Sequence, residues 1–269
     1  MNAPNANPRR ILLSKGTVAP QLLRVTSPAK ERSLLIVAEQ NAEASLLIDL
    51  RKVRSHKMEV TLMRGARVSV FILSGSRSKC HLKQFCSVAS GARMQWWNFT
   101  IGGNAEQDVI LEVSGTSSCA DVRWISHAKK KDVQNLAVHV TYAAPEGSGE
   151  TTMRGVVEDH AVMRTHGSID VEGKARGTET FLSDHILVLD PTARATAVPE
   201  LKVETNDVKA GHSAAVSRIN PEDLFYLQSR GLAPAEVRQM FIKGFLDDLI
   251  SRIDSAEVRD AITGSRLHL

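Results

Sequence analysis

The sequence predicts a mainly β protein, in which a β-helix of stacked coils is followed by a small helical domain. Short runs of alternating apolar and polar residues, separated by Gly, Ser, Asn or Asp, follow one another for about 180 residues. Gly65-Ala66-Arg67 introduces one apolar run and Gly91-Ala92-Arg93 introduces another 26 residues later, a repeat length typical of stacked-coil proteins. At Asn220 the apolar spacing becomes helical. The strand spacing alone leaves a β-sandwich as the alternative.

Residues 1–28 are predicted to be an N-terminal extension ahead of the β-helix. Its start, MNAPNANPRRILLSKG, lacks an apolar signal core, and the chain has no run of eighteen apolar residues. We therefore expect a cytoplasmic protein that does not enter a membrane.

Residues 29–219 are predicted to form the β-helix core. Aromatic residues make up 4% of the chain, so the interior must consist mainly of Val, Ile, Leu and Ala, which suits narrow stacked strands. Asn41-Ala42-Glu43 and Asn104-Ala105-Glu106 each precede a strand and form a second echo. The expected strands are SLLIVA, ASLLIDL, MEVTLM, RVSVFIL, RMQWWNFT, QDVILEVSG, ADVRWISH, LAVHVTYA and HAVMRTHGSIDV.

The cysteines indicate neither a disulfide framework nor a zinc site. There are three of them, an odd number, and they form no CxxC pair. We expect Cys80, Cys86 and Cys119 to behave as buried small apolar side chains.

Residues 220–269 are predicted to form a C-terminal helical domain. Asn220 is suited to cap a first helix, with Pro221 at its first position and Gly231 as its stop. A second helix begins near Pro234, and residues 255–264 are expected to supply a short third helix. The second helix has two apolar stripes, which leaves either an internal three-helix cluster or a docking surface for a partner. The stripes are Val237, Phe241, Phe245 and Leu249, and Ile242, Leu246, Ile250 and Ile253.

The charge of the chain does not indicate a nucleic-acid-binding protein. The net charge is +4, and the basic runs at 51–54 and 129–131 are not interleaved with aromatic residues. We interpret these runs as solvated turns. They also motivate the rival function, a stand-alone β-helix module that binds polyanions.

The most specific pattern lies between Ala193 and Leu232. It resembles the C-terminal region of the SufB/SufD family, the scaffold components of the iron–sulfur cluster assembly machinery, and continues to Gly244-Phe245. Its elements are Pro199 and Leu201 as a turn, Asp207-Val208, His212 followed by small residues, Ile219, and Leu224-Phe225-Tyr226-Leu227 before Arg230-Gly231.

The resemblance implies a right-handed parallel β-helix in a compact member without the N-terminal helical domain of longer relatives. It implies a SufD-like scaffold that pairs through its terminal coils with a SufB-type subunit or a second copy of itself. The helical domain would seat a SufC-type ABC ATPase, and ATP hydrolysis is expected in that partner because this chain has no GxxxxGK[ST] motif. The residues expected to brace or dock the ATPase are Phe225, Tyr226, Arg230, Gly231, Phe241, Ile242 and Phe245, with Ile242 at the surface.

The chain departs from the SufB branch at the positions proposed there to accept sulfur and to bind the cluster. These positions fall at about Leu182 or Ser183 and at Ser213, none of which offers a thiolate or a carboxylate. His212 matches the interface histidine of the SufD branch. We therefore expect no permanently bound cofactor, with iron or a transient iron–sulfur cluster at the subunit interface and His212 as the one ligand from this chain.

Metal and hydrolase alternatives receive less support. The spacing of His160, His166, His185 and His212 fits no single ladder of ligands. Asp159-His160 and Asp184-His185 are neighbours in sequence, and neighbours on a strand point to opposite faces. The chain is therefore not expected to be an enzyme.

Overall fold

The computed structural model describes residues 8–19, 21–26, 32–75 and 79–263, which form sixteen strands and three helices. Sheet A contains β1 (Arg9–Leu13), β3 (Ser33–Ala38), β5 (Ser55–Leu62), β7 (Cys80–Val88), β9 (Ala105–Val113), β11 (Val133–Tyr142), β13 (Val162–Val171) and β15 (Arg194–Val203). Sheet B contains β2 (Leu23–Thr26), β4 (Glu43–Asp49), β6 (Arg67–Ser74), β8 (Arg93–Ile101), β10 (Cys119–Ala128), β12 (Ser148–Val157), β14 (Thr178–Val188) and β16 (Val208–Arg218). The helices are α1 (Pro221–Ser229), α2 (Pro234–Ile250) and α3 (Ala256–Thr263).

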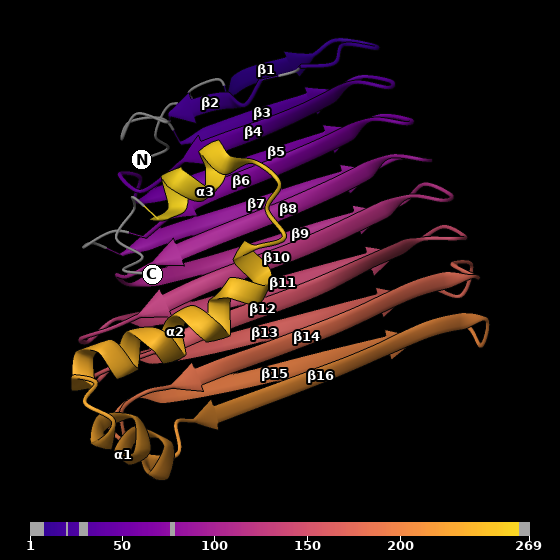
Figure 1. Ribbon diagram of the computed structural model, residues 1–269. Helices are drawn as coiled ribbons and strands as arrows, with labels where there is room; N and C mark the ends of the chain where they lie inside the picture. Colours follow the sequence, from indigo (N-terminus) through magenta and orange to yellow (C-terminus); the bar gives the residue numbers. More distant parts are fainter. Residues whose placement is uncertain (1–7, 20, 27–31, 76–78, 264–269) are drawn as a thin grey trace, which may run out of the picture.

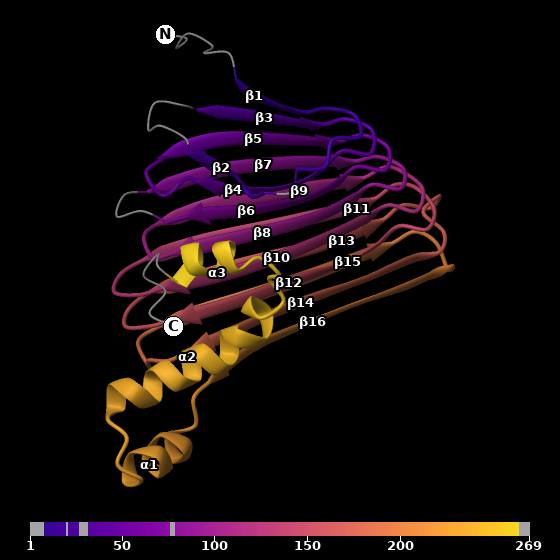
Figure 2. The same ribbon diagram turned by 45° about the horizontal axis from the view of Figure 1, so that its top comes forward.

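The chain alternates between the two sheets, so each pair of consecutive strands makes one coil. Neighbouring strands within each sheet are parallel, and the coils stack into a solenoid (Figure 1). The strands lengthen from 5 residues in β1 to 11 in β16, as the tilted view also shows (Figure 2). The predicted β-helix is confirmed, and the β-sandwich is excluded because it is built from antiparallel pairs.

The core fills the narrow space between the sheets. Strand β11 alternates strictly between buried and more exposed positions, because every second side chain points inward. Two tryptophans lie inside and keep their indole N–H groups bonded: Trp96 donates to Gln84 at 3.2 Å and Trp124 donates to Thr100 at 3.0 Å.

The cysteines are free thiols within this fold. Cys80 and Cys86 are fully buried, which confirms their predicted role as small core side chains, whereas Cys119 is half-buried. Burial raises the pKa of Cys80 to about 11 and also raises that of Cys86. Both thiols therefore stay protonated and unreactive at neutral pH.

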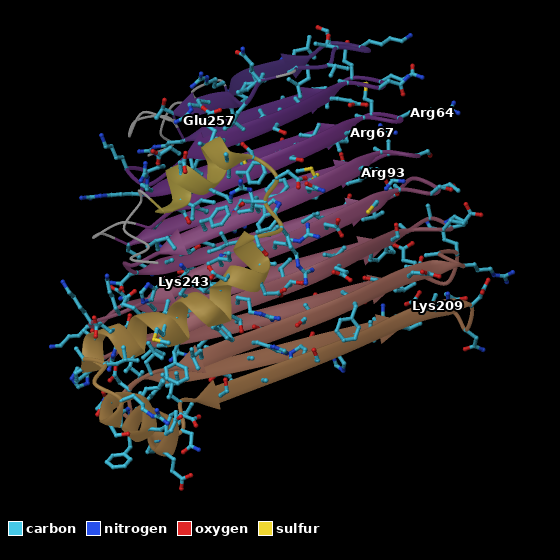
Figure 3. All side chains as sticks on the ribbon, viewed as in Figure 1. Arg64, Arg67, Arg93, Lys209, Lys243 and Glu257 are labelled. Atoms are coloured by element: carbon cyan, nitrogen blue, oxygen red, sulfur yellow. The ribbon has the colours of Figure 1, made fainter. Side chains whose placement is uncertain are left out.

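The Gly-Ala-Arg echo marks equivalent turns. Gly65 and Gly91 have φ angles of 69° and 65°, in the left-handed region that glycine adopts freely. Arg67 pairs in register with Arg93, and both lie along one edge of the solenoid (Figure 3). The 26-residue repeat is therefore one coil.

The second echo was wrongly interpreted. Asn41 lies on the same edge as Gly65, because its N–H donates to Arg64 O in the next turn. Asn104 precedes β9 on the opposite edge, where its side chain accepts from the Val133 N–H. The two asparagines therefore occupy different positions in the coil, and Asn41 contributes its backbone N–H whereas Asn104 contributes its side chain.

The solenoid begins earlier than residue 29. Strands β1 and β2 lie in the segment predicted to be an extension, and they pair with β3 and β4. Leu13 and Val25 are buried in the same core as the later coils. Residues 1–7, 20 and 27–28 of that segment lie outside the described residues.

The helices begin where the sequence predicts but pack elsewhere. Asn220 caps α1 by accepting the Glu222 N–H at 3.0 Å, and Gly231 follows the helix with a φ of 92°. The sequence pattern leaves a three-helix cluster or a docking surface as alternatives, but helices α2 and α3 cross the outer face of sheet B (Figure 1). Within the described residues, no helix has the length and apolar character that crossing a bilayer requires.

Sheet B offers the helices an aromatic surface. Phe71, Trp97 and Phe99 form a stacked ladder with ring centroids 6.1 and 6.0 Å apart. The stripe of α2 that contains Ile242 packs into this ladder, so neither a cluster of the three helices alone nor a free docking face describes it. Ile242 is 1% exposed, and the expectation that it lies at the surface is wrong.

Candidate functional site

The last coil, β15 with β16, ends both sheets and is called here the terminal coil. Each strand has a neighbour on one side, β13 or β14, and its other edge is unpaired within the described residues. Side chains in register with buried core residues of the preceding coil are more accessible here, as for Val216, which pairs with Ile186 and is 46% exposed. The terminal coil therefore leaves an apolar core open at its end.

His212 lies on β16, in register with the buried Leu182, so it belongs to the inward-facing row of the terminal coil. Its side chain is exposed because no further coil covers it. Ser213 pairs in register with Ser183. These two serines occupy the positions predicted to correspond to the sulfur acceptor and the cluster ligand of the SufB branch, and they lie side by side.

Among the described residues, His212 belongs to no cluster of metal ligands. Among the residues that the structure describes, no group of three or more His, Cys, Asp or Glu side chains could hold a metal ion. His139 and His166 do meet edge to face on sheet A, with ring centroids 5.2 Å apart, which the sequence analysis missed. A metal site at His212 stays a prediction that needs donors from a second subunit.

The aromatic pair on α1 does not brace the helices by packing. Phe225 is 74% exposed and Tyr226 is 56% exposed, and α1 buries no side chain. Arg230 donates to the Tyr226 hydroxyl at 3.1 Å and lies over its ring. Phe241 and Phe245 on α2 are half-buried, and Arg154 of β12 covers the Phe245 ring. The docking role of these residues stays a prediction.

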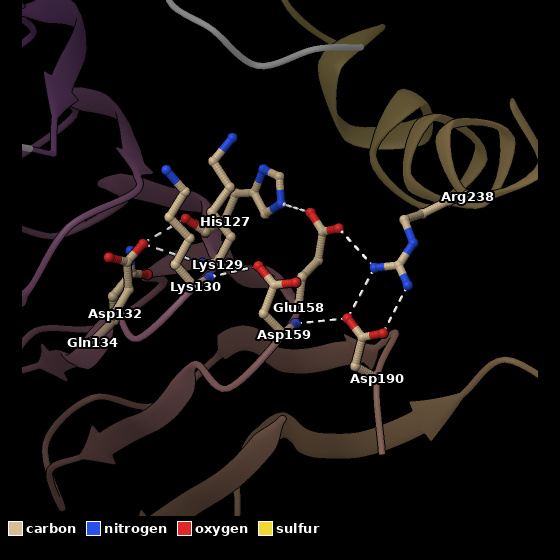
Figure 4. Close-up of polar contacts among 9 residues, drawn as sticks. All are labelled: His127, Lys129, Lys130, Asp132, Gln134, Glu158, Asp159, Asp190 and Arg238. Atoms are coloured by element: carbon tan, nitrogen blue, oxygen red, sulfur yellow. Dashed lines mark hydrogen bonds and ion pairs between the residues drawn. The ribbon is translucent and has the colours of Figure 1, made fainter. Parts of the chain in front are cut away.

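A charged network ties α2 to the turns of the solenoid (Figure 4). The Arg238 guanidinium donates to both carboxylate oxygens of Asp190, at 2.8 and 2.7 Å, and to Glu158 at 3.0 Å. His127 Nε2 lies 2.5 Å from the other oxygen of Glu158. Asp190 and Glu158 belong to successive turns, so the Arg238 side chain of α2 links two coils.

The charges of the network reinforce one another. Burial alone would raise the pKa of Glu158, but hydrogen bonds from His127 and Arg238 hold it below its ordinary value. The hydrogen bond from Arg238 likewise lowers the pKa of Asp190. The planar guanidinium suits this forked contact, which a lysine would not reproduce.

The basic run at 129–131 lies beside the network and does not form a uniformly basic surface. Lys130 and Lys131 line a shallow hollow of about 380 Å³, but Asp159 and Asp190 line it too. The Asp159 carboxylate accepts the Lys130 N–H at 2.8 Å, which joins adjacent turns. Carboxylates this close disfavour the binding of a polyanion at this basic run.

Sequence comparisons place the chain among known proteins. The family model described as SUF system FeS cluster assembly, SufBD core domain, matches residues 24–245. An iron–sulfur cluster assembly SufBD family protein of Mycobacterium tuberculosis is 28% identical over 272 residues, covering 93% of this chain and 68% of the relative. Similar proteins of Mycobacterium leprae (27% identical) and Pyrococcus horikoshii (24%) align with 84% and 86% of this chain, which spans 61% and 54% of their lengths.

Proposed function

Because the chain belongs to the SufBD family of iron–sulfur cluster assembly proteins, we propose that it acts there as a SufD-like, non-catalytic scaffold subunit. In this proposal it pairs with a SufB-type subunit or a second copy through the terminal coil, and its C-terminal helices bind a SufC-type ABC ATPase. The observation that carries the proposal is the open end of the solenoid, where the last strand of each sheet has one unpaired edge among the described residues.

The edge of β16 is better suited to pairing than that of β15. The backbone N–H groups of Arg194 and Glu204 in β15 donate to the preceding coil. Because successive N–H groups along a strand point to opposite sides, the odd-numbered residues between them direct their N–H positions toward the free edge. Pro199 is one of these and has no N–H to offer, and an edge strand is where a sheet tolerates proline. It lies within β15 rather than in the turn predicted from the sequence. Strand β16 contains no proline.

Pairing should depend on the inward face of β16. Val216→Asp should abolish association with the partner subunit, because it places a charge on the open core where the partner must bury it. Ser217→Asp is the matched control, since Ser217 is the exposed next residue on the same strand. Size-exclusion chromatography with light scattering measures the assembly. Equal loss of association in both variants, or in neither, would contradict pairing through this face.

Docking of the ATPase is supported by the exposed apolar surface of α1 and α2. Phe225, Tyr226 and Met240 are each more than half exposed, which is unusual for large apolar side chains that serve only the fold. A tagged chain should therefore retain a SufC-type ATPase from a co-expressing cell. Retention of nucleic acid or polysaccharide in a salt-sensitive way, without the ATPase, would favour the polyanion-binding alternative instead.

His212 is the residue that this chain would contribute to the cluster, which is the cargo of the assembly. An imidazole nitrogen is a suitable ligand for iron, and the small residues around it, Gly211, Ser213, Ala214 and Ala215, leave room for a second subunit. His212→Ala should leave the fold and ATPase binding intact while it removes most of the cluster yield of the reconstituted complex, read from visible absorption. A full yield in this variant would show that His212 is only a solvated residue.

A further inference from the structure

Asp190 joins three parts of the chain that are distant in sequence. Its carboxylate receives both Nη groups of Arg238 on α2, and one of its oxygens also accepts the Asp159 N–H at 2.6 Å. Its backbone carbonyl accepts from Arg218 Nη1 at 3.1 Å. A single turn residue between β14 and β15 therefore contacts both the last residue of β16 and helix α2.

These contacts close a loop. Arg218 ends β16 and Arg238 lies in α2, so the segment between them, residues 219–237, begins and ends at Asp190. The segment contains the whole of α1 and is called here the α1 arm. Because α1 buries no side chain, its position depends mainly on how the two ends of the arm are held.

The α1 arm is held more strongly at Arg238 than at Arg218. The side chain of Asp190 is 20% exposed and that of Glu158 is 13% exposed. Both carboxylates form ion pairs with Arg238, and they belong to neighbouring turns. Partial burial and forked geometry fix the guanidinium better than an exposed ion pair would. Glu158 is itself held by His127, so the anchor is rigid on the solenoid side.

We propose that Asp190 is the positioning residue of the α1 arm, and that it fixes the orientation in which α1 presents Phe225 and Tyr226 to the ATPase. The partner in this statement rests on the proposed function, whereas the anchoring of the arm does not. An arm held in one orientation binds more tightly than a mobile arm, since apparent affinity falls with the fraction of molecules in the competent state.

The anchoring is tested on the free protein by pulsed dipolar spectroscopy. Spin labels are placed at Gln228→Cys on α1 and Lys83→Cys on β7, both exposed, in a Cys119→Ser background because the other two cysteines are fully buried. The parent should give one narrow distance distribution. Asp190→Asn, which keeps an acceptor for the Asp159 N–H but removes the charge, should broaden it.

Two further variants make the result decisive. Arg238→Gln removes the same contact from the helix side and should broaden the distribution as Asp190→Asn does, even if one of the two folds poorly. Asp132→Asn is the matched control, because Asp132 lies in a neighbouring turn and its carboxylate accepts the Lys129 N–H within that turn. Narrow distributions in both Asp190→Asn and Arg238→Gln would overturn the proposal.

The consequence for docking is measured separately by titration with the SufC-type ATPase. Asp190→Asn should bind it about tenfold more weakly than the parent, while Asp132→Asn binds normally. A broadened arm with unchanged affinity would overturn the part of the proposal that concerns docking. Failure of the parent itself to bind would refute the proposed function and leave the anchoring result standing.

Discussion

Replacing Ile242 by glutamate should detach α2 from sheet B and lower the free energy of unfolding by about 3 to 5 kcal/mol. Ile242 is 1% exposed and packs in the cluster that contains Trp97 and Phe99. The new carboxylate would have to be buried in an apolar contact, or the helix would have to leave the sheet to hydrate it. Either outcome removes the packing that holds the C-terminal helices.

Urea unfolding followed by tryptophan fluorescence measures this effect, because Trp97 lies under the helices. Met240→Glu is the matched control: Met240 is two residues away on the same helix and 52% exposed, so its replacement should change stability by less than about 0.5 kcal/mol. Equal unfolding midpoints for Ile242→Glu and the parent would show that the helices do not rest on sheet B as described.

The stacked coils were predictable because each coil repeats one simple physical requirement. Inward residues must be apolar and turn residues must adopt unusual backbone angles, so the alternation and the spacing of Gly65 and Gly91 are both visible in the sequence. The capped start of α1 was equally predictable, since the cap involves only neighbouring residues.

The covering of sheet B by helices also has a signal in the sequence. The central strands of sheet A alternate, as in β11, whereas β6, β8 and β10 each contain a continuous run of five buried residues. Continuous apolar runs such as VFIL and the adjacent tryptophans Trp96 and Trp97 indicate strands buried on both faces. The runs in β6, β8 and β10 therefore indicate that a further layer covers this part of sheet B.

The charged network was harder to foresee. Arg238 meets Glu158 and Asp190 across 80 and 48 residues of sequence, and many other acids could have been its partners. The stacking of turns does bring residues that follow successive strands of one sheet together, which relates Glu158 to Asp190. The stacking of turns does not predict where α2 crosses sheet B, because the position of α2 depends on the packing of Ile242 and its neighbours on that sheet.

Asp184 should give the free energy of unfolding a pH dependence of its own, which Asp184→Asn removes. The residue points into the core from β14 and is fully buried. One carboxylate oxygen accepts from the Thr165 hydroxyl at 2.5 Å, and the other has no hydrogen-bond partner among the described residues. Burial raises the pKa of Asp184 to about 6, although the bond from Thr165 and the charge of Arg154 oppose the shift.

Asp184 makes the folded protein less stable as the pH rises, because its pKa is raised in the folded state. The pKa of Asp184 in the folded state lies above its ordinary value of 3.8, so the folded protein holds this proton more tightly than the unfolded chain does. The stabilisation is complete below pH 3.8 and is lost as the pH rises through about 6. Above that pH the buried carboxylate costs at most about 3 kcal/mol relative to a neutral side chain.

Asp184→Asn should therefore be more stable than the parent at pH 8 and similar to it near pH 4, with urea unfolding as the measurement. Glu158 and Asp190, whose pKa values are lowered, respond to pH in the opposite sense, but they are present in both proteins and cancel in the difference. Thr165→Val should move the loss of stability to higher pH, because it removes the bond that favours the carboxylate. A difference between Asp184→Asn and the parent that stays constant from pH 4 to pH 8 would mean that Asp184 does not titrate within the core.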